Sequence, residues 1–351
     1  MSWFMKTLFY KTILVLLKCY NHFYFKKVRV YGLENIPKNS GLIFSPNHQG
    51  AFLDPLLVGT TCGHELNPLT RSDIFRGPFH WFLDALKMLP VYRIRDGFSS
   101  LKKNNVIFEM CYDLLRDKKK LMMFSEGSHH NEYFLKRLSK GSSRLALEAQ
   151  EKYPKTQMYI VPVGINYSHH QMPWQEVHIV YGKAVPVGSF LNDYKENKGV
   201  TINKLRDALE VGMKKCLWLP DKDYSYLEKK KYVHLENSKL GFFEFKEALV
   251  NEQSKLKQAK SGGKSLNVVI KLLGLLNIIP LLMIRKVVRL FSDVVFHNAI
   301  KYLFGLIIFA LWWVILLLFG IYFEGIYLGV SLFIGSLVLL YLRQEVISTL
   351  K

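Results

Sequence analysis

The feature that most constrains the fold of this chain is a pair of long apolar runs near its end. They extend from Tyr302 to Phe323 and from Ile326 to Leu342, are rich in Leu, Ile, Phe and Val, and are separated only by Glu324 and Gly325. A helix of about 20 apolar residues crosses the hydrocarbon core of a bilayer. The sequence therefore predicts a transmembrane hairpin of two helices at residues 302–323 and 326–342.

A third apolar run, Leu266 to Ile284, precedes the hairpin. It is long enough to span a bilayer, but Lys271, Asn277 and Pro280 interrupt it, and ionisable side chains are costly in hydrocarbon. We therefore expect residues 266–284 to form an interfacial or re-entrant element.

Basic residues flank the hairpin, whereas its turn carries only an acid. They are Arg285, Lys286, Arg289 and Lys301 before it and Arg343 and Lys351 after it. Because Lys and Arg accumulate on the cytoplasmic side of membrane proteins, we expect an integral membrane protein whose main domain and both hairpin ends are cytoplasmic. A bacterial cytoplasmic membrane is favoured over the endoplasmic reticulum, because neither a long N-terminal extension nor an organelle signal is seen.

The chain carries 48 Lys and Arg residues against 28 Asp and Glu residues, a formal net charge of +20. This excess favours an acidic partner, and the apolar tail favours membrane lipids and an anionic membrane surface over nucleic acid, for which no binding signature is present. The cysteines lie far apart without a CxxC pair, which argues against a metal cluster or a disulfide framework. They are Cys19, Cys62, Cys111 and Cys216.

The N-terminal segment, Trp3 to Phe25, is apolar but does not resemble a signal peptide. Lys11 and Lys18 interrupt it, and no small-residue cleavage site follows. A membrane-associated amphipathic helix within residues 1–27 is the preferred interpretation, and an ordinary core-packing helix is the alternative.

Short strand-like runs separated by turn residues begin at Val28. They read VRVYGLENIP, GLIFSPNH, KKLMMFSEG, MYIVPVGINYS and EVHIVYGKAVPV, and helical patterns at Ser99 to Leu115 and Gly141 to Tyr153 lie between them. This alternation predicts an α/β domain over residues 28–226. A charged helical connector at residues 227–264 and the membrane region at residues 265–351 follow.

Residues that can carry chemistry first gather in FSPNHQGAFLDPLL, where five residues separate His48 from Asp54. Residues six apart on a helix lie about 240° apart around its axis, so the pair can meet only through a turn. Pro46 and Gly50 favour a turn, and Asp54 followed by Pro55 is typical of a helix N-cap. A carboxylate on one imidazole nitrogen leaves the other nitrogen free to act as a general base. A structural histidine beside a plain N-cap aspartate explains the pair equally well.

Three further blocks follow. The loop FSEGSHH, residues 124–130, leads to Lys140 at a helix entry, which is a natural anion site, although a surface turn is the alternative. In LPVYRIRDG, Arg93 and Arg95 lie two residues apart on a predicted strand, so their side chains would share one face and could bind a phosphate group together. The alternative is a strand face exposed to solvent. The fourth block, IVPVGINYS, places Pro162 at a strand end.

In this order and at these distances, the four blocks resemble the glycerolipid acyltransferase superfamily, over about Val28 to Pro186. The resemblance implies an α/β fold with a mixed β-sheet flanked by helices. It also implies transfer of a fatty acyl group from an acyl thioester, acyl-CoA or acyl carrier protein, to the hydroxyl of a lysophospholipid or glycerol-3-phosphate-type acceptor in phospholipid biosynthesis. No cofactor besides the thioester co-substrate and no acyl-enzyme is implied.

In that family the first-motif histidine is the general base and the aspartate orients it, which maps onto His48 and Asp54. The mapping also makes Arg93 the ligand of the acceptor phosphate and places Glu126 and Gly127 in the acceptor pocket. The fourth-motif proline maps onto Pro162, and its strand end is interpreted as the lining of a narrow channel, with a turn as the alternative.

This chain departs from the family pattern in two motifs. Most members have four residues between the histidine and the aspartate, and the five found here resemble the fungal glycerol-3-phosphate/dihydroxyacetone-phosphate branch. Ser125 replaces the usual proline of the third motif, and Ser128-His129 stand in place of its threonine and arginine. We therefore also consider a lyso-aminolipid as the acyl acceptor. Candidates to replace the missing arginine are Arg71, Arg95, Lys136 and Lys140.

Two hypotheses from other classes remain. A non-catalytic lipid-binding module with the same fold would be indicated by loss of His48, Asp54 or Glu126, and all three are present. A metal-dependent hydrolase built on the paired histidines is disfavoured, because adjacent residues on a strand point to opposite faces, and no metal site is predicted. We expect His169 and His170 to lie in a solvated loop.

Overall fold

A computed structural model describes residues 3–77, 80–92, 103–258 and 264–348. Within these residues the chain forms one eight-stranded sheet. Its strands are β1 (Lys27–Tyr31), β2 (Gly41–Pro46), β3 (Leu66–Arg71), β4 (Leu89–Val91), β5 (Lys120–Met122), β6 (Met158–Tyr167), β7 (Glu176–Tyr181) and β8 (Val185–Pro186).

The sheet is mixed, as the resemblance implies. Its order is β1-β7-β6-β2-β5-β3-β4, with β8 beside β6. Strand β6 pairs antiparallel with β7 and β8, and the other neighbours are parallel. Because β5, β2 and β6 are adjacent and parallel, the loops after β2 and β5 and the end of β6 meet at one edge of the sheet, where ligands bind in open α/β sheets.

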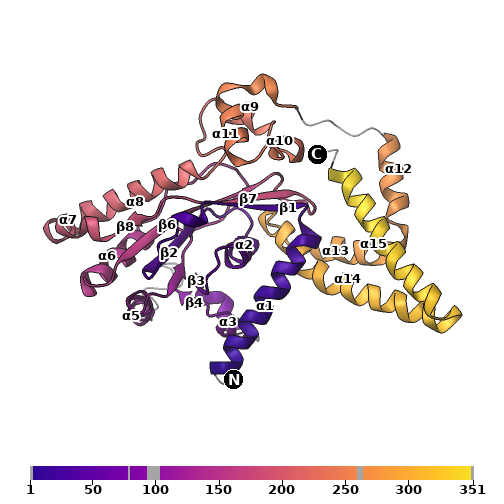
Figure 1. Ribbon diagram of the computed structural model, residues 1–351, viewed down its shortest axis with the longest axis horizontal. Coiled ribbons are helices and arrows are strands. Elements are labelled where there is room, and N and C mark those ends of the chain that lie inside the picture. Colours follow the sequence, from indigo (N-terminus) through magenta and orange to yellow (C-terminus); the bar gives the residue numbers. More distant parts are fainter. Residues whose placement is uncertain (1–2, 78–79, 93–102, 259–263, 349–351) are drawn as a thin grey trace.

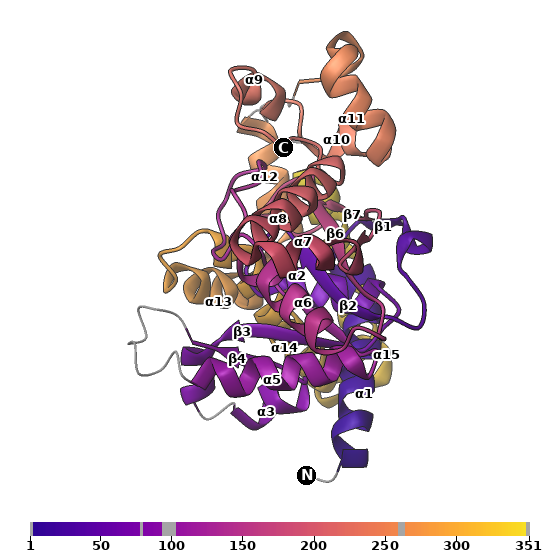
Figure 2. The same cartoon turned by 90° about the vertical axis from the view of Figure 1, so that its left-hand side faces the viewer.

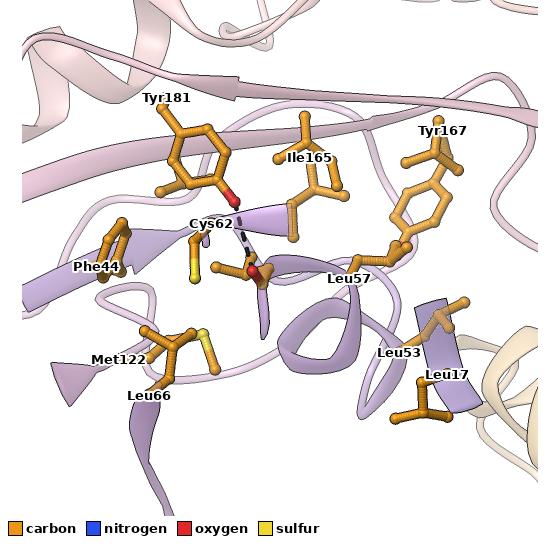
Figure 3. Packing of buried hydrophobic residues seen from close by; sticks show 14 of the residues in the cluster. Leu17, Phe44, Leu53, Leu57, Cys62, Leu66, Met122, Ile165, Tyr167 and Tyr181 are labelled. Atoms are coloured by element: carbon orange, nitrogen blue, oxygen red, sulfur yellow. Dashed lines mark hydrogen bonds between the residues drawn. The ribbon is translucent and has the colours of Figure 1, made fainter. Parts of the chain in front are cut away.

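Helices cover both faces of the sheet (Figures 1 and 2). Alternate residues of the central strands point to opposite faces. Phe44 packs with α1 and α2 on one face, the layer shown in Figure 3, and Ile43 packs with α5, α6 and α8 on the other. The helices of this part are α1 (Trp3–Tyr24), α2 (Leu53–Thr61), α3 (His80–Ala85), α5 (Lys103–Arg116), α6 (Gly141–Lys152), α7 (Leu191–Glu196) and α8 (Lys198–Lys215).

The predicted connector contains three short helices, α9 (Tyr226–Lys230), α10 (Leu235–Ser238) and α11 (Phe242–Asn251). They enclose a small apolar cluster in which Phe242 and Phe245 pack with Trp218. The boundaries of the domains remain predictions.

The predicted membrane region contains α12 (Lys264–Leu273), α13 (Ile278–Arg289), α14 (Val295–Glu324) and α15 (Ile326–Ser348). Among the described residues, α14 and α15 are each long and apolar enough to span a membrane, and they contain the two predicted spans. The apolar run before them is bent by 55° between Leu273 and Leu275, the geometry of a broken span or a re-entrant loop. Gly325, at φ 90°, lies between α14 and α15.

Polar contacts dock the membrane region onto the α/β domain through α1. The Tyr24 hydroxyl donates to Asn298 Oδ1 at 2.6 Å, and the Tyr302 hydroxyl donates to Asn21 Oδ1 at 2.7 Å. At the far end of α15, Glu345 binds Lys26 and Trp174.

Helix α1 has one core face and one exposed apolar face. Leu17 and Tyr24 are buried in the core, so the core-packing alternative holds for that face. The exposed face has the apolar side chains that the membrane-associated interpretation requires. They are Met5, Leu8, Val15, Leu16 and Phe23.

Candidate active site

His48 lies in the loop after β2, with its side chain 18% exposed. Its Nδ1 is 2.9 Å from Oδ2 of Asp54, so the predicted contact is present. Its ring stacks on Phe124, with the ring centres 4.0 Å apart. A carboxylate at Nδ1 fixes the tautomer that carries its proton there. His48 Nε2 has no hydrogen-bond partner in the described part of the chain and is therefore left as a proton acceptor.

The Asp54 carboxylate is fully buried and receives four hydrogen-bond contacts. Oδ2 accepts from the backbone N–H groups of Gln49 and Gly50, at 2.9 and 2.8 Å, besides contacting His48. Oδ1 accepts from the hydroxyl of Tyr167 at 2.7 Å. Burial, and then the Asp54 charge, raise the pKa of Tyr167 well above its ordinary value, so this hydroxyl remains a donor.

The predicted N-cap role of Asp54 is wrong. Helix α2 begins at Leu53 with Phe52 as its N-cap, so Asp54 is the second helical residue. Its carboxylate turns back to close the His48 loop instead of capping the helix. The five-residue spacing fits because Ala51 takes φ 49° and Gly50 has no Cβ, which would lie 2.6 Å from Asp54 Oδ1.

Glu126 links the loop after β5 to the loop that carries His48 through hydrogen bonds. Its buried carboxylate accepts from the backbone N–H of His48 at 2.7 Å through Oε1. Its Oε2 contacts His130 Nε2 at 3.0 Å and accepts from the backbone N–H of Lys136 at 2.9 Å. Both carboxylate oxygens are therefore used within the protein, so Glu126 can order the pocket without touching a substrate.

The next residues of this loop form its exposed tip. Gly127 has φ 71°, a conformation that favours glycine, and both it and Ser128 are exposed. Lys136 Nζ donates to Ser128 Oγ at 3.2 Å and to the His129 carbonyl at 3.3 Å. Lys140 is exposed at the N-cap of α6.

Ser125, which stands where the family has proline, belongs to a buried chain of serine hydroxyls. Its Oγ lies 2.6 Å from Ser45 Oγ and 2.7 Å from Ser142 Oγ. These contacts join β2, the third-motif loop and the first turn of α6, so the serine has a local structural role.

The predicted arginines lie at another part of the sheet or beyond the described residues. Arg71 ends β3, pairs in register with Val91 of β4, and its guanidinium binds Asp73. Arg93 and Arg95 lie outside the part of the chain that the structure describes.

Pro162 is buried in β6. A Cβ added to Gly182 or Gly212 would come within 3.0 or 3.1 Å of its ring, which marks a tight packing position. Its channel role remains a prediction.

Gln49 and His170 form a buried support that the sequence does not predict. His170 Nε2 lies 3.1 Å from Gln49 Oε1, and Gln49 Nε2 donates to the Tyr133 carbonyl at 3.1 Å. The expected solvated position is wrong for His170, which is 7% exposed and stacks on Tyr133. Burial lowers the pKa of His170 to about 3, so it is neutral at physiological pH.

Within the described ranges, no three or more His, Cys, Asp or Glu side chains gather as metal ligands would. The adjacent histidines of the third block contact different carboxylates, Asp293 for His129 and Glu126 for His130. Their arrangement therefore gives no support to the hydrolase hypothesis.

A family model described as Acyltransferase matches residues 27–166, which contain His48, Asp54 and Glu126. No curated protein matches the chain. The fold is similar to the crystal structure of the 1-acyl-sn-glycerophosphate (LPA) acyltransferase, PlsC, from Thermotoga maritima, at 19% identity and a TM-score of 0.39, covering 57% of this chain and 80% of that one.

Proposed function

We propose that the protein is a membrane-bound O-acyltransferase of the glycerolipid acyltransferase superfamily. The match of residues 27–166 to a family model described as Acyltransferase supports this proposal. It would transfer a fatty acyl group from acyl-CoA or acyl carrier protein to the hydroxyl of a lysophospholipid or a glycerol-3-phosphate-type acceptor. The main support is the contact of His48 Nδ1 with the buried Asp54 carboxylate, which leaves Nε2 without a partner among the described residues.

In the proposed reaction, His48 Nε2 takes the proton of the acceptor hydroxyl while the oxygen attacks the thioester carbonyl carbon. The tetrahedral intermediate collapses by breaking the carbon–sulfur bond, and the thiolate leaves with the proton that His48 had taken. Ester and thiol are the products, so no cofactor is consumed. Asp54 stabilises the imidazolium that forms between the two steps and keeps its ring in place.

The acceptor would lie on the side of the third-motif loop. Lys136 and Lys140 supply positive charge near this loop, and Ser128 supplies an exposed hydroxyl. Arg93, Arg95 and Arg71 are further candidates for a phosphate ligand. Glu126 would act by holding the backbones of His48 and Lys136, because its oxygens already accept from their N–H groups.

The membrane setting suits this chemistry. Helices α14 and α15 suggest membrane association, and the charge of +20 favours an anionic lipid surface. An α/β domain held against the cytoplasmic face of a bacterial membrane would take its acceptor from the bilayer and add the acyl chain during phospholipid biosynthesis.

An acyl-transfer assay on detergent-solubilised protein tests the proposal. Labelled acyl-CoA and acyl carrier protein thioesters would be offered with glycerol-3-phosphate, lysophosphatidate, neutral lysophospholipids and lyso-aminolipids. We expect transfer to one acceptor class, and its loss in folded His48→Ala. Absence of transfer from folded protein would instead support the non-catalytic lipid-binding module.

A further inference from the structure

The segment between α13 and α14 reaches the candidate active site, although it lies outside the residues that the family model matches. Asp293 Oδ2 is 2.9 Å from His129 Nε2. The ring of Phe296 meets the ring of His129 edge to face, with centres 5.1 Å apart. The ring of His129 in turn meets that of His48 at 5.5 Å and 85°. One side chain therefore separates the membrane region from the proposed general base.

Asp293 is well suited to hold a histidine. Its Oδ1 accepts from the backbone N–H of Val295 at 3.0 Å, which fixes the carboxylate at the start of α14. Partial burial raises the pKa of Asp293, but the hydrogen bonds from Val295 and His129 outweigh it, so the pKa lies below its ordinary value. Asp293 is therefore a charged acceptor at neutral pH.

His129 depends on this contact for its orientation. The preceding Gly127 and Ser128 are exposed, and Lys136 binds the backbone carbonyl of His129 rather than its ring. Among the described residues, the hydrogen-bond partner of the His129 ring is Asp293. Ring contacts with His48 and Phe296 complete its surroundings, but edge-to-face contacts are weaker and less directional.

We propose that Asp293 is a positioning residue of the acyl-transfer site and that the membrane region thereby completes this site as well as anchoring it. The inference rests on the proposed function. An acceptor hydroxyl must lie within hydrogen-bond reach of His48 Nε2, so the ring beside His48 adjoins the bound acceptor. His129, which stands where the family has arginine, is thus an acceptor contact whose place Asp293 sets.

The test compares Asp293→Asn and Asp293→Glu with Glu345→Gln in the full-length protein. Glu345 is a matched control, because it also joins the membrane region to the α/β domain, but through Lys26 and Trp174. We expect Asp293→Asn to raise the acceptor KM about 10-fold and to leave the donor KM within about twofold, because only the acceptor side is displaced. Asp293→Glu should recover most of the loss, and Glu345→Gln should leave both KM values unchanged.

An unchanged acceptor KM in Asp293→Asn would reject the inference, as would an equal rise in Glu345→Gln, which would indicate general undocking. Thermal unfolding midpoints identify variants that fail to fold. If the unmodified protein transfers acyl groups and His48→Ala does not, the proposed function is supported whatever the result for Asp293→Asn. No transfer by the unmodified protein would reject both.

Discussion

The hydroxyl of Tyr167 donates a 2.7 Å hydrogen bond to Oδ1 of Asp54, the carboxylate oxygen that His48 does not contact. Tyr167 ends β6 and Asp54 lies in the first turn of α2, so a strand and a helix together fix the carboxylate. The orientation of the His48 ring therefore depends on a relay of side chains that begins in the core.

Tyr167→Phe should lower kcat about 10-fold, because a buried hydrogen bond to a charged group is lost and Asp54 can rotate. Tyr181→Phe is a matched control. Tyr181 is equally buried on the same side of the sheet, and its hydroxyl contacts Thr61 of α2 at 2.8 Å without reaching Asp54. Measured kcat values and unfolding midpoints separate the two effects, and equal kcat values in both variants would contradict the relay.

Glu126→Gln should both destabilise the protein and lower its activity. An amide nitrogen cannot accept a hydrogen bond, so a buried N–H donor of His48, Lys136 or the His130 ring loses its partner, at about 1–3 kcal/mol. Activity should fall at least about 10-fold, since the His48 backbone is released. Glu132→Gln is the control, because Glu132 binds Tyr226 and Lys230 near the same loop. Wild-type stability in Glu126→Gln would contradict this role.

His170 should make the protein less stable as the pH falls. Burial holds its folded-state pKa near 3, below the ordinary 6.5, so between these values the unfolded chain binds a proton that the folded chain does not. Stability is therefore unaffected above pH 6.5 and falls by about 1.4 kcal/mol for each pH unit below it, until the pH approaches 3. Unfolding midpoints at pH 7.5 and 5.5 should differ less in His170→Gln than in the unmodified protein. An equal difference in both would show that other groups cause the loss.

Local sequence predicts the parts of the site that are close in the chain. His48 and Asp54 are six residues apart, so a turn between a strand and a helix is enough to bring them together. The N-cap prediction is wrong because the Asp54 carboxylate accepts hydrogen bonds from the backbone N–H groups of Gln49 and Gly50 in the tight turn, instead of from N–H groups of its own helix.

Local sequence patterns do not predict contacts between segments that are far apart in the chain. Tyr167 lies 113 residues from Asp54, and Asp293 lies 164 residues from His129. The first contact depends on β6 lying beside β2, and the second on how α14 docks onto the α/β domain. Strand β3 is also missed, because Asn67 and Pro68 are poor strand formers and only pairing with β5 and β4 holds them extended.

The orientation of the hairpin follows from where its ends are held. Asp293 before α14 contacts His129, and Glu345 near the end of α15 contacts Lys26 and Trp174, so both ends lie against the α/β domain. The turn between α14 and α15 lies at the right-hand edge of Figure 1, away from the sheet. If α14 and α15 cross a membrane, this turn is on the side opposite the α/β domain.

Glu324→Cys should therefore react with a membrane-impermeant maleimide in intact bacterial cells, because the positive-inside rule places the basic hairpin ends in the cytoplasm and the acidic turn outside. Tyr224→Cys, at a fully exposed position of the α/β domain, should react only after the cells are permeabilised. The unmodified chain, whose exposed cysteine is Cys19, gives the background. Labelling of Tyr224→Cys but not of Glu324→Cys in intact cells would reverse the orientation and place the proposed acyl-transfer site outside the cytoplasm, away from its thioester donors.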